Sequence, residues 1–388
     1  MDIKEVYDKF VMDTYGRTGL CVESGSGSVA VGDDGVDYID FGSGIATNSL
    51  GFCDSDWVYA VCEQTKALQH TSNYYYNVPC GLFAAKLCEI TGYDKVFFGN
   101  SGAEANECAL KLARKYSFDK YGRKDRGTVI TLTNSFHGRT LSTLAATGQD
   151  TFHNYFYPFP PGFEYVKTND IDELKSKINA DTCAIMFEYI QGEGGVIPLT
   201  SEFVDAIFEL AREHDLVTIA DEVQTGVGRT GEFSAGTHYG KKADISTFAK
   251  GLGGGLPIGV CAAASGFSTV LTKGTHGSTF GGNPVVCAGG MSVLKKVSEP
   301  EFLRRVREKG QRITAALKEF GKVKSISGKG LMFGLELTGI TAVEAMNQCA
   351  KQGLLVLTAK DKLRLLPPLN ISDENIDKAI IILKNILN

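Results

Sequence analysis

Two charged side chains stand in apolar stretches of the sequence. Asp221 directly follows the run 216–220, which has the composition of a buried strand. Further along, Lys250 lies between an apolar run and a glycine-rich loop. A buried carboxylate is costly without a cation, and a lysine amine in apolar surroundings has a lowered pKa, as an imine-forming amine requires. The pair therefore predicts either a plain Asp221–Lys250 salt bridge or a site where a ligand supplies the positive charge.

A second candidate is the segment Gly99-Asn100-Ser101-Gly102-Ala103, which passes from a predicted strand into a predicted helix. Small residues at such a junction let backbone N–H groups and the positive end of the helix dipole face an anion. The segment lacks both the lysine of GxxxxGK[ST] and the GxGxxG pattern, so a nucleoside triphosphate or dinucleotide loop is not expected. By itself it predicts either a phosphate cradle or a tight turn.

Each of these candidates lies just after a short apolar run. The sequence has five such runs, which we expect to be buried strands. Helical patterns over 104–116 and 202–214 alternate with the runs, which favours an α/β domain with a mainly parallel sheet. Ligands bind beyond the carboxyl ends of such strands, so we expect one shared site rather than unrelated caps and loops. The runs are 95–98, 129–132, 183–187, 216–220 and 245–248, followed by Ser101-Gly102-Ala103, Phe136-His137-Gly138-Arg139, Glu188, Asp221-Glu222 and Lys250.

The ends of the chain have a different pattern. They contain hairpin signals at 33–35 and 328–330, together with long helical patterns. We therefore predict a large α/β domain over residues 51–282. A smaller α+β domain is predicted from residues 1–50 and 283–388.

Composition limits the class of protein. The 388 residues include 40 basic and 45 acidic side chains, a balance of −5 that argues against a nucleic-acid or membrane-surface binder. No apolar stretch approaches the ~18 residues of a membrane span, and the first five residues carry no secretory signal pattern. The ten cysteines lack metal-ligand spacing, which argues against a zinc site and predicts reduced, mostly buried thiols in a cytoplasmic protein.

Six motifs, in order, make the chain resemble the class-III, pyridoxal-phosphate-dependent aminotransferases. Within that family it is most similar to the acetylornithine aminotransferases, from about Tyr15 to the C-terminus. The motifs are FGNSGAEANE (98–107), FHGRT (136–140), QGEGG (191–195), DEVQTGVGRTG (221–231), TFAKGLG (247–253) and HGSTFGGNP (276–284).

The resemblance implies a fold-type-I homodimer in which a mainly parallel seven-stranded sheet carries pyridoxal phosphate at the subunit interface. Lys250 would hold the cofactor as an imine, and Asp221 would pair with its protonated ring nitrogen. That nitrogen would supply the positive charge that burial of Asp221 requires. The other positions implied are Phe136 on the ring face, Gln224 at the phenolic oxygen, Glu188 in the cofactor pocket, Ser101, Gly102 and Ala103 at the phosphate, and Thr279 of the partner subunit.

The implied reaction moves the terminal amino group of N2-acetylornithine to 2-oxoglutarate, giving N-acetylglutamate 5-semialdehyde and glutamate, a step of arginine biosynthesis. Arg139 and Arg364 match the carboxylate-binding arginines of the family, and a planar guanidinium suits bidentate carboxylate binding. Glutamate has two carboxylates and would use both arginines. Acetylornithine has one, which would bind Arg139 while Glu193 neutralises Arg364.

Two departures from the family pattern bear on the substrate. The segment 51–55 (GFCDS) replaces a Gly-His-x-His-Pro segment, and Tyr189 replaces a proline. Succinylornithine, ornithine, 4-aminobutyrate and putrescine therefore stay open as amino donors. A cofactor-binding protein without turnover is an alternative of a different class, against which Lys250, Asp221 and both arginines argue. A nucleotide loop at 251–255 would leave the other motifs unexplained.

Overall fold

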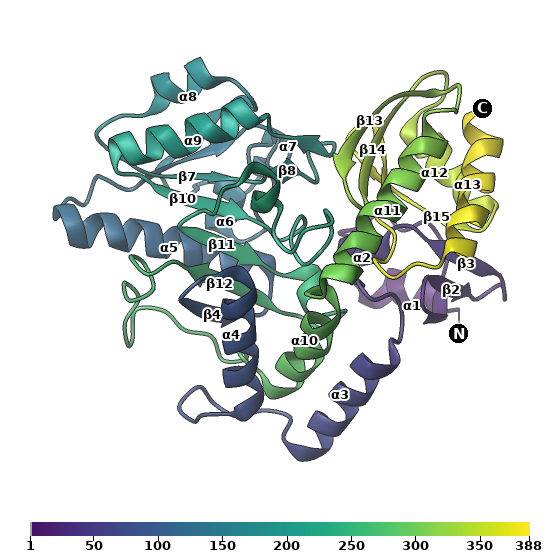
Figure 1. Cartoon of the computed structure of the whole chain (residues 1–388), viewed down its shortest axis with the longest axis horizontal. Helices are drawn as coiled ribbons and strands as arrows, with labels where there is room; N and C mark the ends of the chain where they lie inside the picture. The colour runs from purple at the N-terminus through teal and green to yellow at the C-terminus, as the bar shows by residue number, and fades with distance from the viewer. Residues whose placement is uncertain (1) are drawn as a thin grey trace.

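The computed structural model describes residues 2–388, and a seven-stranded sheet forms the centre of its larger lobe (Figure 1). Strand β12 runs antiparallel to both of its neighbours, whereas the other four pairings are parallel. The prediction of an α/β fold with a mainly parallel seven-stranded sheet is confirmed. In spatial order the strands are β4 (Lys95–Gly99), β12 (Gly259–Ala263), β11 (Ile245–Phe248), β10 (Val217–Asp221), β7 (Thr182–Phe187), β5 (Thr128–Leu132) and β6 (Phe163–Val166).

Helices cover both faces of this sheet because its central strands are apolar on both sides. Neighbouring side chains of a strand point to opposite faces. In β7, Phe187 joins the apolar cluster that contains buried residues of α9 (Ser201–His214). Met186, one residue earlier, joins the cluster of α5 (Gly102–Tyr121) on the other face. Both helices include the segments for which the sequence predicts helical patterns.

The five predicted strands are present within one residue of their expected bounds, but β6 and β12 were not predicted. Strand β12 has the sequence GVCAA, which is poor in branched and aromatic residues. Its position between β4 and β11 depends on pairing with strands that are distant in sequence or reversed in direction. Local pattern therefore misses it.

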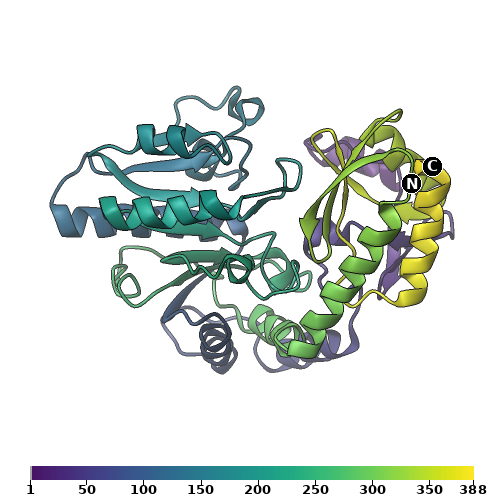
Figure 2. The ribbon, with the colours of Figure 1, turned by 45° about the horizontal axis from the view of Figure 1, so that its top comes forward.

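A smaller lobe contains both ends of the described chain (Figure 2). Strand β15, from the C-terminal part, pairs in parallel with β3, from the N-terminal part, so the two segments share one sheet. The predicted hairpins are present as β2–β3 and β13–β14. The elements are β1 (Val22–Ser26), β2 (Val29–Gly32), β3 (Asp37–Asp40), β13 (Val323–Lys329), β14 (Met332–Leu337), β15 (Leu354–Leu355), β16 (Leu357–Ala359), β17 (Lys362–Leu365), α11 (Pro300–Leu317), α12 (Ala342–Lys351) and α13 (Asp373–Leu387).

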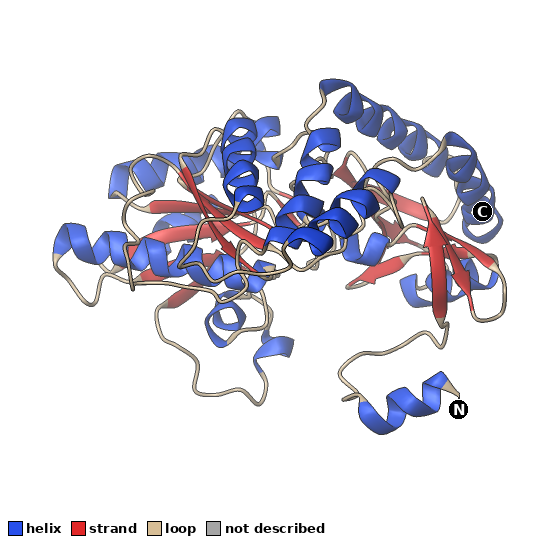
Figure 3. Cartoon of the chain, turned by 90° about the horizontal axis from the view of Figure 1, so that it is seen from below, coloured by secondary structure: helices blue, strands red, loops and turns tan. Residues whose placement is uncertain are grey.

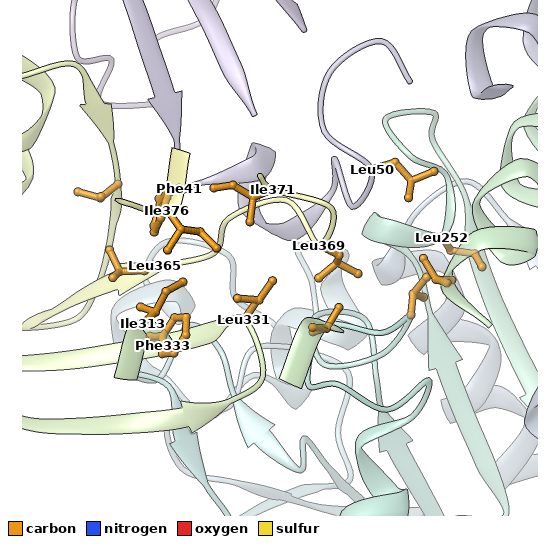
Figure 4. Packing of buried hydrophobic residues seen from close by; sticks show 14 of the residues in the cluster. Phe41, Leu50, Leu252, Ile313, Leu331, Phe333, Leu365, Leu369, Ile371 and Ile376 are labelled. Carbon is orange, nitrogen blue, oxygen red and sulfur yellow. The ribbon is translucent and has the colours of Figure 1, made fainter. Parts of the chain in front are cut away.

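One apolar cluster continues from the larger lobe into the smaller one (Figure 4). It includes Leu252 in the larger lobe and Phe333 and Leu365 in the smaller lobe, all nearly inaccessible to solvent. Leu252 lies two residues from Lys250, and Leu365 directly follows Arg364. The same core therefore anchors the segments that carry both residues.

Helix α10 (Pro284–Val297) packs against α3 (Ser55–Ala67) and α4 (Val78–Thr91). The indole N–H of Trp57 in α3 donates a hydrogen bond to the carbonyl of Gly253, at 3.0 Å. The division into residues 51–282 on one side and 1–50 with 283–388 on the other stays a prediction. Met1, with which the second set begins, lies outside the described residues.

Helix α1 (Ile3–Phe10) lies apart from the body of the protein in Figure 3, and no residue of it is buried. In residues 2–388, no helix combines the length and apolar character that crossing a membrane requires. The remaining elements are α2 (Ser43–Ala46), α6 (Leu141–Ala146), α7 (Asp150–His153), α8 (Ile171–Lys177), β8 (Ile190–Gln191), β9 (Ile197–Pro198), and the 3-10 helices η1 (Ala235–Tyr239) and η2 (Lys250–Leu252).

The expectation that the cysteines are mostly buried is wrong. Cys53 and Cys62 are exposed, and three others are only partly buried. Cys53 lies in a turn, and Cys62 lies on α3, a helix in which no residue is buried. All ten cysteines are free thiols, and the five buried ones are Cys108, Cys183, Cys261, Cys287 and Cys349.

Candidate active site

The polar ends of all five predicted strands line one cavity of about 430 Å³. They meet because the carboxyl ends of parallel strands lie at the same edge of a sheet. Glu222 instead points away and accepts backbone N–H bonds from Ala235 and Gly236. Thr279 is exposed and does not line this cavity. The predicted residues that do line it are Ser101, Gly102, Ala103, Phe136, Arg139, Glu188, Glu193, Asp221, Gln224 and Lys250.

Lys250 begins the 3-10 helix η2 at the end of strand β11, with a left-handed φ of 44°. Such a conformation is uncommon for a residue other than glycine and is held by the surrounding structure. Within residues 2–388, the Lys250 amine has no hydrogen-bond or ion-pair partner, so the plain Asp221–Lys250 salt bridge is not found. Burial lowers the pKa of Lys250, although the charges of Glu193 and Asp221 act in the opposite direction.

Asp221 is buried among hydrogen-bond donors. Its Oδ2 accepts from Asn106 Nδ2 and lies 2.8 Å from His137 Nδ1, and its Oδ1 accepts from the backbone N–H of Val223. A carboxylate only accepts hydrogen bonds, so His137 carries a proton on Nδ1. Asn106 and His137 orient Asp221, and no lysine or arginine among residues 2–388 pairs with it. A ligand cation can therefore complete the site.

The helix α5 begins at Gly102, beside the same cavity. Ser101 caps it, accepting the backbone N–H of Glu104 at 3.2 Å. A Cβ on Gly102 would lie 2.8 Å from Val223 Cγ1, so only glycine fits there. Because α5 has 20 residues, its N-terminus has the exposed N–H groups and dipole that bind an anion.

These features fit pyridoxal phosphate, the cofactor that the resemblance implies. A phosphate requires an anion site, which the N-terminus of α5 provides. A reactive aldehyde requires an accessible amine, which is present at Lys250. A protonated ring nitrogen requires a buried carboxylate that no lysine or arginine occupies, which Asp221 provides within residues 2–388.

Glu188 connects two loops at the cavity. Its Oε2 accepts the backbone N–H of Phe136 at 3.1 Å, and its Oε1 accepts that of Gly192 at 3.2 Å. Burial raises the pKa of Glu188 to about 7, with a further contribution from the charge of Asp221. The carboxyl group therefore holds a proton at mildly acidic pH.

Arg364, on strand β17, reaches the cavity residues from the smaller lobe. Its Nη1 donates to Glu193 Oε1 at 2.6 Å and to Gln224 Oε1 at 3.3 Å. Burial alone would raise the pKa of Glu193, but the charge and hydrogen bond of Arg364 hold it below its ordinary value. The Nε atom of Arg364 is buried and has no partner among the described residues. The guanidinium is thus only partly satisfied.

Arg139 differs from Arg364 because no carboxylate pairs with it within residues 2–388. It is exposed, and its guanidinium carbon lies 4.1 Å from the ring centre of Phe152 and 5.6 Å from that of Phe136. Arg139 therefore lines the cavity without a carboxylate partner, whereas Arg364 contacts Glu193 of the lining and is neutralised by it. A ligand with one carboxylate and a ligand with two would meet different charge balances there.

The sequence analysis missed Asn106. Besides Asp221, it donates to the carbonyl of His137 and accepts from the hydroxyl of Thr247, each at 2.7 Å. Asn106 lies within a predicted helix and a quoted motif, but its inward direction depends on how α5 packs. A polar residue on an otherwise apolar helix face was the available signal.

The two departures from the family pattern lie outside the lining of the cavity. Tyr189 is buried and stacks on Tyr239, with ring centres 5.3 Å apart. In the segment 51–55, Asp54 caps α3 and forms an ion pair with Lys296 at 2.7 Å. Both sites have packing or capping contacts of their own.

The chain is similar to known proteins along nearly its whole length. The profile of the family described as "Aminotransferase class-III" matches residues 11–387. An acetylornithine aminotransferase of Haemophilus ducreyi is 49% identical over 388 residues, covering 100% of this chain and 98% of that protein. A succinylornithine transaminase of Salmonella enteritidis is 42% identical, with 96% and 93% covered. The crystal structure of an ornithine aminotransferase from Toxoplasma gondii superposes with a TM-score of 0.95 at 30% identity, covering 100% of this chain and 94% of that one.

Proposed function

The chain belongs to the class-III aminotransferases, and on that premise we propose that it transfers the terminal amino group of N2-acetylornithine to 2-oxoglutarate. The observation that supports these two substrates is that one arginine of the site has a carboxylate partner and the other has none among residues 2–388. Arg364 is neutralised by Glu193, whereas Arg139 is available. Acetylornithine has one carboxylate for Arg139. Similarity to an acetylornithine aminotransferase over the whole chain supports the same substrate.

Pyridoxal phosphate, when bound, supplies an electron-withdrawing ring that stabilises negative charge on the substrate carbon. The residues of the chain bind it and move protons. Lys250 provides the amine for attachment, and its lowered pKa favours the neutral form that accepts a proton from the substrate carbon. Asp221, held by Asn106 and His137, keeps a proton on the ring nitrogen.

The Glu193–Arg364 pair explains how one pocket takes two substrates. With acetylornithine bound, Glu193 keeps the buried Arg364 from being an uncompensated charge. With glutamate bound, the second carboxylate replaces Glu193 at Arg364. Glu193 then has to turn away, which is feasible because its side chain is 26% exposed whereas that of Arg364 is 3% exposed.

We further propose that the enzyme works as a homodimer in the cytoplasm, with Thr279 of one subunit at the phosphate of the other. Exposed aromatic side chains support a partner surface, since monomeric proteins rarely expose such groups together. Tyr74, Tyr75, Tyr76 and Phe280 are all more than half exposed. Ten free thiols fit a reducing compartment. Light scattering after gel filtration tests the dimer, and a monomer with full activity would contradict it.

The reaction is tested by half-reactions on the purified, yellow enzyme. Each amine, namely N2-acetylornithine, N2-succinylornithine, ornithine, 4-aminobutyrate and putrescine, is mixed alone with the enzyme, and the cofactor absorbance is followed. We expect the fastest bleaching with acetylornithine and recovery of the band with 2-oxoglutarate. A faster reaction with another amine would replace the substrate but keep the reaction type. No bleaching with any amine would refute turnover altogether.

A further inference from the structure

Arg139 is held by aromatic rings rather than by an acidic partner. Its guanidinium carbon lies 4.1 Å from the ring centre of Phe152, a distance at which the cation is attracted to the ring face. Phe136 is further away, at 5.6 Å. The two rings meet each other edge to face, with centres 5.8 Å apart and an interplanar angle of 76°. Phe152 is thus the nearer contact of Arg139.

The position of Phe152 is fixed relative to the loop that carries Arg139. Its own backbone N–H donates to the carbonyl of Gln149, and the Gln149 amide donates to the carbonyl of Ser135, both at 3.0 Å. The next residue, His153, binds the carbonyl of Thr147 through Nε2 at 2.7 Å. These bonds join α7 to the residues just before Phe136. Phe152 is therefore held close to the start of the loop that carries Arg139.

A guanidinium that stacks on a ring through its face keeps its N–H edge free. That edge makes the bidentate contact with a carboxylate. A free arginine side chain would lose rotamer freedom when it binds a substrate, whereas a stacked one has lost part of it already. The stacking therefore favours substrates that bring a carboxylate to Arg139.

We propose that Phe152 is a positioning residue that presents Arg139 to the α-carboxylate of the amino donor, and so favours amino acids over plain amines. The proposal rests on the proposed function, because it takes the binding of an α-carboxylate by Arg139 as given. It predicts an effect of Phe152 that depends on whether the substrate has that carboxylate.

The test compares two amines that differ only in the carboxylate. N-acetylputrescine is N2-acetylornithine without its carboxyl group. Half-reaction rates are measured for wild type, Phe152→Leu and Phe152→Tyr over a range of concentrations of each amine. Phe152→Leu removes the ring, while Phe152→Tyr keeps it. Phe118→Leu, at an exposed position of α5, is the matched control for the substitution itself.

We expect Phe152→Leu to lower kcat/KM for acetylornithine about tenfold, mainly through KM, and to leave N-acetylputrescine within twofold. Phe152→Tyr should restore acetylornithine to within about twofold of wild type. An equal loss of kcat/KM for both amines would mean that Phe152 only supports the fold. No loss of kcat/KM for acetylornithine would mean that Arg139 does not need the ring. Either result overturns the proposal. Melting temperatures and the cofactor absorbance of each variant identify a variant that has not folded.

If the proposed function is wrong, the half-reaction rates show a different pattern. If the wild-type enzyme reacts with glutamate but not with acetylornithine, the substrate assignment is wrong. The role of Phe152 is then decided by glutamate against 2-aminobutyrate, which lacks the side-chain carboxylate that would reach Arg139. A selective loss for glutamate in Phe152→Leu would still support the role of Phe152, and equal losses would refute it.

Discussion

Glu188 gives the sharpest prediction, because the structure buries its carboxyl group between two backbone donors and away from any lysine or arginine partner among residues 2–388. Burial raises its pKa from an ordinary 4.5 to about 7. Between these values the folded protein binds a proton that the unfolded chain has already released. Stability therefore falls as the pH rises through this window. Each pKa unit corresponds to about 1.4 kcal/mol, so the loss between pH 5 and pH 8 is about 2–3 kcal/mol.

Glu188→Gln removes this titration. The glutamine amide would face a backbone N–H of Phe136 or Gly192, which costs stability, but that cost does not change with pH. The difference in unfolding free energy between variant and wild type should thus shift by about 2–3 kcal/mol in favour of the variant from pH 5 to pH 8. Urea unfolding followed by the fluorescence of Trp57, the sole tryptophan, measures it. Both proteins are freed of cofactor in the same way.

Glu213→Gln, at an exposed position near the end of α9, is the matched control and should show no such shift. A difference between Glu188→Gln and wild type that stays constant within about 0.5 kcal/mol would refute the reasoning. It would show that Glu188 is ionised in the folded protein throughout this range. The two backbone N–H bonds would then outweigh burial.

Three other substitutions test the site. Lys250→Ala should abolish the covalent attachment of the cofactor that borohydride reduction makes permanent, and should lower turnover at least about 10³-fold. Peptide mass spectrometry detects the attachment. A labelled peptide that does not contain residue 250 would show that another lysine binds the cofactor. Asn106→Ala leaves Asp221 with one donor fewer and should cost about 1–3 kcal/mol in urea unfolding, while Asn347→Ala on the exposed face of α12 should cost almost nothing. Glu193→Ala leaves Arg364 uncompensated and should slow the acetylornithine half-reaction at least about tenfold more than the glutamate half-reaction; equal losses would contradict the exchange of partners at Arg364.

The edge of the sheet was predictable because its signal is local. A short apolar run followed at once by Asp221 or Lys250 shows both the strand and the place where it ends. Since parallel strands end at one edge, the sequence was sufficient to bring these residues together. The strand–helix junction at Gly102 was likewise predictable, but local pattern alone left open whether it is a phosphate cradle or a tight turn.

Contacts between distant segments were not predictable. The pairing of Arg364 with Glu193 was expected only from the resemblance, since 171 residues separate them and nothing in either segment refers to the other. Asn106 and Phe152 contact the site through tertiary packing of α5 and α7. Strand β12 was missed because alanine, cysteine and glycine have no clear strand preference. In each case position depends on packing between elements rather than on local pattern.

Because strand β12 runs antiparallel to β11, Lys250 lies in a loop that connects two adjacent strands of the sheet. Residues 249–258 leave the sheet at the end of β11 and return at the start of β12, beside the strand they left. The return point is crowded, because a Cβ on Gly259 would lie 1.9 Å from the carbonyl oxygen of Ser101. Both ends of this short loop are therefore fixed, one of them against the segment that we propose binds the phosphate. The length of this loop cannot change without moving Lys250 relative to Ser101. Insertions at 251–255 should therefore inactivate the enzyme, whereas the exposed stretch 272–274 should tolerate them.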